Sequence, residues 1–260
     1  MTYVAPVDLD LPWMPAASHG GQFASPPPRQ IVIHSCECPM TPGIAKSLAG
    51  PNWFGGSAAG TSPHGMFDPN GGVEEVHTDT IAWHCGNGNS TSVGYEHAGY
   101  AAFTRAEWTT DAGITMLKAS AKSTAKAAKA LGIPARWLSV AQVADNEQGF
   151  CTHNDMRLAR GGTTHTDPGP NFPYDLYMQY VVAEMGGTTP PTESGDEFDM
   201  DDKTFDTKLE AALRKALGND YGRVSARTAA RVRDMKFGTH GIWNHFTSFS
   251  SAVKKKLEIG

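Results

Sequence analysis

The sequence lacks a long apolar run and a leader of the secretory type. None of its apolar runs approaches the ~18 residues that a membrane-spanning helix needs. The first segment, MTYVAPVDLDLPWMPAA, has no basic residues and is interrupted by prolines, which excludes a signal peptide. These absences predict a chain that is made in a cytoplasm, is not inserted into a membrane, and does not leave by the secretory route.

Cysteine is also scarce, with four residues in a chain of 260. Paired C-x-x-C spacings are absent, which excludes a structural zinc site built from cysteines alone. Cys36 and Cys38 are separated by a single residue, too close for a comfortable bridge, and no secretion signal is present. Free thiols are therefore the expectation.

Basic residues are too few in the main body of the chain for a general nucleic-acid binder. Residues 1–195 carry 10 basic and 17 acidic side chains, whereas residues 196–260 carry 12 and 10. Binding to phosphates needs clustered lysine and arginine, so a nucleic-acid partner is not expected.

What the sequence does contain is typical of a globular α/β domain, since 40% of its residues are apolar. An irregular arm, rich in proline, occupies residues 1–28. The run QIVIHSCE predicts a buried strand that ends near His34. The segment DPNGG at 68–72 is typical of a hairpin turn between two strands, and TSVGYEHAGY is a further strand candidate.

Two helices are predicted after these strands. The first is long and extends from a capping box formed by Thr104 and Glu107 to a stop at Gly132. The second covers residues 175–184. Strands interspersed with packing helices predict an α/β fold in which a single central mixed β-sheet is flanked by helices.

The last part of the chain is less informative. Residues 1–185 form the predicted main domain, and the composition of residues 186–202 is typical of a linker. Residues 203–260 are predicted to form a small helical segment, with an apolar stripe along its first helix. This segment is suited to binding anionic polymers through its basic helices or to self-association, and the sequence favours neither over the other. The stripe consists of Phe205, Leu209, Leu213 and Leu217.

Several of the ten histidines lie in positions where they could serve chemistry. A catalytic zinc site takes three protein ligands from His, Cys, Asp or Glu and keeps one position for water. The candidates are His34 at the strand end, His64 in SPHGMF, His84 in AWHCG, His153 in CTHND, and His165 in HTDPGP.

The order of these motifs resembles the zinc-dependent N-acetylmuramoyl-L-alanine amidases of the amidase type 2 and peptidoglycan-recognition-protein family. The sequence VIHS is followed by SPHGMF, AWHCG and SVGYEHAG, and then by THND and HTDPGPNFPYD. The match covers residues 28–180, and within the family the chain looks most similar to endolysins of actinobacterial phages. The resemblance implies the family fold, with a Zn²⁺ site in a surface groove.

The resemblance also implies roles for particular residues. The zinc ligands would be His34, His153 and Asp167, and the catalytic residues would be Glu96 as the base and His165 as an oxyanion stabiliser. A three-histidine ligand set that uses His165 in place of Asp167 remains an alternative.

Residues expected to line the substrate groove are His64, Trp83 and His84. Asp155 would either orient His153 or cap the turn that follows it.

The function implied by the resemblance is hydrolysis of the amide between N-acetylmuramic acid and L-alanine in bacterial peptidoglycan. A phage endolysin of this type would reach the wall through a membrane pore made by another protein. A non-catalytic peptidoglycan-binding module of the same fold is one alternative. A cysteine–histidine hydrolase that uses Cys36 or Cys151 as the nucleophile is another.

Overall fold

The computed structural model describes residues 5–24, 27–50 and 60–187. Nearly all of the predicted linker, from residue 188 onwards, and the predicted helical segment 203–260 lie outside the described residues. In the described ranges, no helix combines the length and the apolar character required to cross a membrane.

A five-stranded mixed sheet with the order β3-β2-β4-β1-β5 forms the centre of the domain. Strand β1 (Gln30–Ser35) is parallel to β4 (Ser92–His97) on one side and to β5 (Gly149–Thr152) on the other. Strand β2 (Gly65–Asp68) runs parallel to β4 and forms an antiparallel hairpin with β3 (Gly71–Glu74). The predicted strand near His34, the DPNGG hairpin and the strand in TSVGYEHAGY are thus confirmed.

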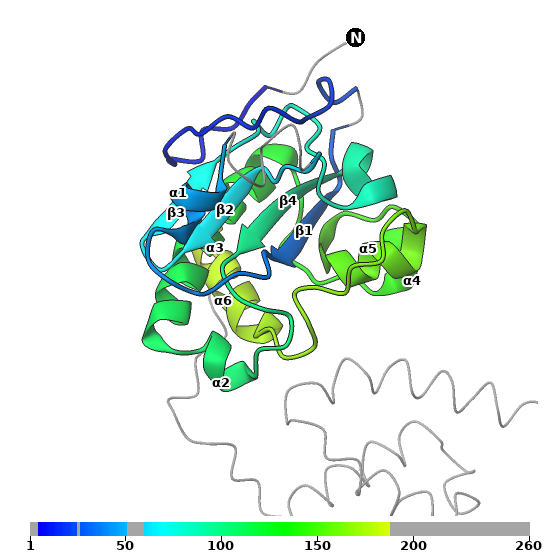
Figure 1. The fold of residues 1–260 in the computed structure, drawn as a ribbon. Helices are drawn as coiled ribbons and strands as arrows, with labels where there is room; N and C mark the ends of the chain where they lie inside the picture. The colour runs from blue at the N-terminus through cyan, green and yellow to red at the C-terminus, as the bar shows by residue number, and fades with distance from the viewer. Residues whose placement is uncertain (1–4, 25–26, 51–59, 188–260) are drawn as a thin grey trace, which may run out of the picture. The chain divides into compact units, whose positions relative to one another are not determined.

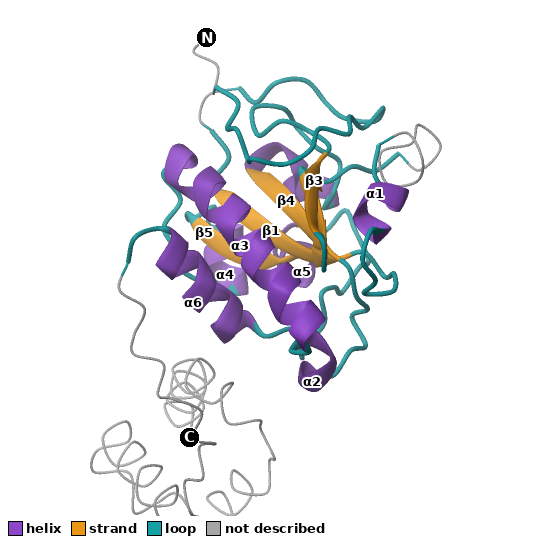
Figure 2. Cartoon of the chain, turned by 90° about the vertical axis from the view of Figure 1, so that its left-hand side faces the viewer, coloured by secondary structure: helices purple, strands orange, loops and turns teal. Residues whose placement is uncertain are grey.

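Helices pack on both faces of this sheet, as Figures 1 and 2 show, which confirms the predicted fold class. Helix α3 packs against β2, β3 and β4, and α6 lies beside it, so these two helices cover one face (Figure 2). Helix α5 contacts β1, β5 and the short helix α4. The helices are α1 (Ile44–Leu48), η1 (Gly86–Thr91), α2 (Arg105–Trp108), α3 (Asp111–Leu131), α4 (Val140–Ala144), α5 (His153–Arg160) and α6 (Tyr174–Glu184).

The alternation of side chains along β1 divides the core into two parts. Ile31 and Ile33 belong to the large apolar cluster that contains the inner face of α3. Val32 belongs to a smaller cluster with Cys151 of β5 and Met156 of α5. Successive residues of a strand point to opposite faces, so His34 lies on the same face as Val32, away from α3.

The single long helix predicted from Thr104 to Gly132 is wrong, because the chain forms two helices there. The capping box of Thr104 and Glu107 is present, but it starts the short helix α2, which ends at Trp108. Thr110 then caps α3 by accepting a hydrogen bond from the backbone N–H of Gly113. A Cβ at Gly113 would lie 2.0 Å from the carbonyl oxygen of Trp108, so only glycine permits this close turn.

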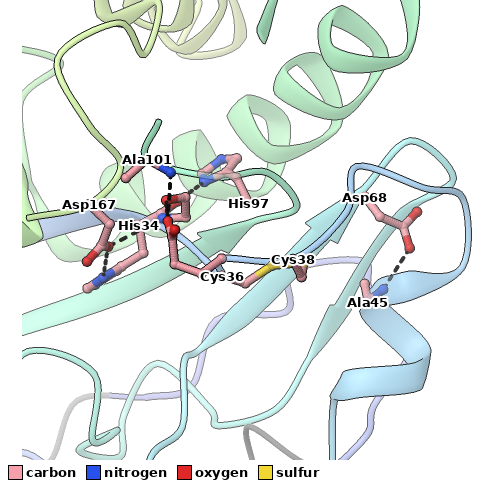
Figure 3. Close-up of a disulfide and its surroundings, with 10 residues drawn as sticks. His34, Cys36, Cys38, Ala45, Asp68, His97, Ala101 and Asp167 are labelled. Carbon is pink, nitrogen blue, oxygen red and sulfur yellow. Dashed lines mark hydrogen bonds and ion pairs between the residues drawn. A yellow bond between two sulfur atoms is a disulfide. The ribbon is translucent and has the colours of Figure 1, made fainter. Parts of the chain in front are cut away.

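The expectation of free thiols is wrong for Cys36 and Cys38, which form a disulfide (Figure 3). Glu37 between them has a φ of 50°, and this left-handed turn brings the two Cα atoms to 5.4 Å from each other. The sequence spacing alone does not reveal that turn. The other two cysteines, Cys85 and Cys151, are free and buried.

Candidate metal centre

Two neighbouring parallel strands place His34 and Glu96 side by side. His34 of β1 is in register with Glu96 of β4, and residues paired in this way point to the same face of the sheet. Both side chains are nearly inaccessible, with 0% of His34 and 7% of Glu96 exposed. The oxygen Oε1 of Glu96 is 3.9 Å from Nδ1 of His34, whereas its other oxygen, Oε2, is buried without a hydrogen-bond partner.

His153 is delivered to the same place by the junction of β5 and α5. It is the first residue of α5, directly after the strand, and the helix start is fixed by a capping box between Thr152 and Asp155. Asp155 accepts hydrogen bonds from both the N–H and the hydroxyl of Thr152. Of its two predicted roles, the cap is therefore confirmed.

Asp167 reaches the centre from the loop that follows α5. The loop passes so close to the backbone at Ala101 that a Cβ on Gly169 would lie 1.9 Å from the Ala101 carbonyl oxygen. Gly169 has a φ of 85°, a conformation that glycine adopts without strain. The backbone N–H of Ser35 donates a hydrogen bond to Asp167 Oδ2 at 3.3 Å, which ties the loop to the end of β1.

The ligand atoms of these residues form a compact triangle. Nδ1 of His34 is 3.1 Å from Nδ1 of His153 and 3.0 Å from Oδ2 of Asp167, and Nδ1 of His153 is 3.0 Å from Oδ1 of Asp167. Ligands bound tetrahedrally to zinc, at about 2.0–2.1 Å, lie about 3.3 Å from one another. The three residues therefore form a potential metal site, and their number and type leave a position for water.

The electrostatics of the site favour metal ligands in their binding forms. Burial lowers the pKa of His34 to about 4, although its hydrogen bond with Asp167 opposes this, so the ring is neutral near pH 7. Burial tends to raise the pKa of Asp167, but hydrogen bonds with His153 and His34 outweigh it and hold this pKa well below the ordinary value. A neutral imidazole and an ionised carboxylate are the forms that bind a cation.

Glu96 shows the opposite shift. Burial, with a further contribution from the negative charge of Asp167, raises the pKa of Glu96 well above its ordinary value. A carboxyl group with a raised pKa, next to a potential metal site, is better suited to accept a proton than an ordinary carboxylate.

His165 lies at the solvent side of the centre. Its ring stacks on that of His153, with centroids 5.1 Å apart, and Nδ1 is 3.9 Å from Oδ1 of Asp167. Its side chain is 69% exposed, and the compact triangle contains Asp167 instead of His165.

Thr163 in the same loop also contacts the site, although the sequence did not predict it. Its Oγ1 is 2.9 Å from Nε2 of His153. It stands two residues before His165 in a run of small polar residues that carries no signal of its own.

The three residues predicted to line the substrate groove have different environments. Trp83 is 40% exposed, and its backbone N–H donates a hydrogen bond to Oγ of Ser62 at 3.1 Å. His64 is completely buried, with Nδ1 accepting from the N–H of Gly94 and Nε2 next to the carbonyl of Thr80. Its predicted contact with substrate is therefore wrong, because tertiary packing places the ring inside the domain. His84 is 8% exposed, and its Nδ1 is 3.0 Å from Nε2 of His34.

The cysteines do not form a nucleophile site in this structure. Cys36 is in the disulfide next to the end of β1 (Figure 3), and Cys151 is fully buried with its pKa raised by burial. A reactive thiol needs access and a lowered pKa. The cysteine–histidine hydrolase hypothesis is contradicted for both residues.

Comparison with known proteins agrees with this geometry. The family described as N-acetylmuramoyl-L-alanine amidase (Amidase_2) matches residues 24–170. The chain belongs to this family. The match spans all five strands and the triangle of His34, His153 and Asp167.

Individual relatives of this amidase family member are more distant. N-acetylmuramoyl-L-alanine amidase A from Achromobacter lyticus is 28% identical over 197 residues, which is 68% of this chain and 96% of the relative. The hydrolase AmiA from Staphylococcus aureus, solved with its ligand, has a TM-score of 0.50 at 18% identity and covers 68% of this chain and 87% of its own. An AmpD structure has a TM-score of 0.46 at 19% identity, covering 66% of this chain and 94% of its own. The similarity to AmiA is evidence for the fold alone.

Proposed function

We propose that this amidase family member is a zinc-dependent peptidoglycan hydrolase. Its reaction would be hydrolysis of the amide that joins the lactyl group of N-acetylmuramic acid to the L-alanine of the stem peptide. The observation that carries this proposal is the placement of Glu96, with an unpartnered buried oxygen, beside the triangle of His34, His153 and Asp167.

Zinc is the metal that this donor set fits. Two imidazole nitrogens and one carboxylate, in a buried site with 3.0–3.1 Å between neighbouring ligand atoms, suit a catalytic zinc with an open position. When bound, zinc would polarise the substrate carbonyl and lower the pKa of water at the site.

Glu96 is the proposed general base and acid. Its carboxylate would take a proton from the attacking water as the water oxygen bonds to the carbonyl carbon. The same proton would then pass to the alanine nitrogen as the carbon–nitrogen bond breaks, so that Glu96 ends the cycle ionised. The raised pKa of Glu96 makes its carboxylate a stronger base toward the attacking water.

His165 is the proposed stabiliser of the negative charge that develops on the carbonyl oxygen. Its ring is anchored by stacking on His153, yet most of its surface is open to solvent and to an incoming substrate. A donor aimed at the developing oxyanion lowers the barrier more than it strengthens substrate binding. Trp83, which is 40% exposed and directly precedes His84 in the chain, is the proposed contact for the substrate.

The biological role that we propose is that of a phage endolysin that acts on the host wall after a separate membrane pore releases it. This part rests on the resemblance in motif order to endolysins of actinobacterial phages. Residues 203–260 would then add wall binding or self-association, in keeping with their basic and apolar helical pattern.

The test is product analysis on purified peptidoglycan. Amidase activity frees the amino group of the stem-peptide L-alanine and the lactyl carboxyl of muramic acid, and it should disappear with a chelator and return with zinc. Products with free reducing sugar ends or with other newly formed N-termini would contradict the proposed bond. Binding to peptidoglycan without any cleavage by the zinc-loaded protein would favour the non-catalytic module instead.

A further inference from the structure

The ring of His84 lies behind His34, on the side away from the candidate metal centre. His34 presents Nδ1 to His153 and Asp167, while its Nε2 is 3.0 Å from Nδ1 of His84. The two rings are nearly perpendicular, with an interplanar angle of 89°. The nitrogens face each other at hydrogen-bond distance, with room for a single N–H between them.

The neighbours of His84 decide which of its nitrogens carries hydrogen. Its Nε2 is 3.4 Å from the backbone carbonyl oxygen of Ser92 and 3.4 Å from Oγ of the same residue. The hydroxyl of Ser92 donates to the carbonyl of Gly88 at 2.8 Å, so its lone pairs remain for His84. Both of these Ser92 groups therefore accept, and the only other neighbour of Nε2 among the described residues is the Cys85 thiol, a weak donor with Sγ 3.9 Å away. An Nε2 without hydrogen would place its lone pair against that of the Ser92 carbonyl. The hydrogen of His84 belongs on Nε2.

From this arrangement we infer that His84 is a positioning residue that sets the tautomer and the orientation of His34. With its hydrogen on Nε2, the neutral His84 ring can only accept at Nδ1, so His34 must donate from Nε2. The remaining nitrogen of His34, Nδ1, then presents a lone pair to His153 and Asp167. This inference rests on the proposed function, because it assigns His84 a role in holding the ligand of the proposed zinc.

The surroundings of His84 are shaped to hold this ring. A Cβ at Gly94 would lie 2.3 Å from Nδ1 of His84, so strand β4 has room for the ring only because residue 94 is glycine. The backbone at the base of the ring is also fixed. The side-chain oxygen of Asn89 accepts hydrogen bonds from the N–H of His84 at 3.0 Å and of Cys85 at 2.7 Å. A residue held this rigidly and 8% exposed acts on His34 instead of on a substrate.

The test uses two substitutions of His84 in the full chain and a matched control. His84→Leu removes the acceptor at similar bulk, whereas His84→Asn keeps an oxygen close to the position of Nδ1. The control, His64→Leu, also removes a buried histidine with two hydrogen bonds. The ring of His64 packs on that of His84, with centroids 5.8 Å apart, so this variant tests the effect of altered packing beside His84 while the acceptor at His84 Nδ1 is kept. The readout is the zinc dissociation constant of the folded protein, measured by competition with a chelator.

We expect His84→Leu to weaken zinc binding about 10- to 100-fold, with His84→Asn recovering part of the loss and His64→Leu close to the wild type. A folded His84→Leu protein with the zinc affinity of the wild type would overturn the inference. An equal loss of affinity in His64→Leu would also overturn it, because the effect would then follow from altered packing around His84 and not from the acceptor at its Nδ1.

A second measurement does not depend on a variant that folds. Nitrogen-15 NMR of the zinc-loaded wild type should show hydrogen on Nε2 of His84 and a scalar coupling between His84 Nδ1 and His34 Nε2. Hydrogen on Nδ1 of His84 would contradict the inference. A wild type that binds no zinc overturns both this inference and the proposed function, whereas zinc binding without amide cleavage overturns the proposed activity alone.

Discussion

Substitution of Glu96 by glutamine should change activity and stability in opposite directions. The side chain is 7% exposed, and its Oε2 has no hydrogen-bond partner, so no hydrogen bond at this oxygen is lost when an amide replaces the carboxyl. Glutamine has nearly the same volume but cannot accept the proton of the attacking water. We expect turnover to fall about 100-fold or more, which corresponds to about 2.7 kcal/mol in activation free energy.

The stability change follows from the raised pKa of Glu96. A carboxyl whose pKa in the folded state lies above its ordinary value of 4.5 holds protons more tightly when folded. Its stabilising contribution is complete below pH 4.5 and is lost as the pH rises toward the folded-state pKa. At pH 7 the zinc-free wild type therefore contains a costly buried group, and zinc-free Glu96→Gln should be at least as stable as the wild type.

Three assays on the same protein decide this prediction: turnover on soluble muropeptides, bound zinc, and urea unfolding of the zinc-free chain. The control is Glu37→Gln, which also removes a nearby carboxylate but retains an acceptor for Ser35 and Ala101, and it should keep turnover within a few-fold. Wild-type turnover in Glu96→Gln would refute the assignment of the base. Loss of zinc together with turnover would instead make Glu96 part of the metal site.

Other predictions test the ligands, a second buried carboxylate and the domain boundary. His34→Ala or His153→Ala should lose most bound zinc and nearly all lytic activity; metal analysis with full zinc in both variants contradicts the ligand set. Burial raises the pKa of Glu75 to about 8, so its contribution to stability declines as the pH rises from 4.5 to about 8. Glu75→Gln should flatten this decline in urea unfolding at pH 5 and pH 8, and an unchanged decline would oppose the prediction. A chain ending at Gly187 should cleave soluble muropeptides like the full chain but act less on intact walls; equal loss on both substrates would place residues 188–260 in the catalytic fold.

The strands that hold the first half of the site could be predicted from sequence because their signals are local. The β-branched run before His34 and the DPNGG turn each specify backbone geometry within a few residues. Strand β5 and helix α5 were not predicted, although His153 lies at their junction. With four and eight residues, they are too short for a periodic pattern to emerge.

The roles of the histidines depend on contacts that sequence spacing does not contain. His64 and His84 stand in similar motifs, but folding buries one against Gly94 and Thr80 and places the other against His34. The left-handed turn at Glu37 likewise decides that Cys36 and Cys38 form a bridge. The histidine contacts join segments that are far apart in the sequence, so only the assembled fold specifies them.

The most direct test of the account is a crystal structure of the zinc-loaded protein with anomalous data collected on both sides of the zinc edge. We predict one strong zinc peak bound to Nδ1 of His34, Nδ1 of His153 and a carboxylate oxygen of Asp167, with Glu96 close by and not bound. A peak coordinated by His165 in place of Asp167, or no zinc between His34 and His153, would contradict it.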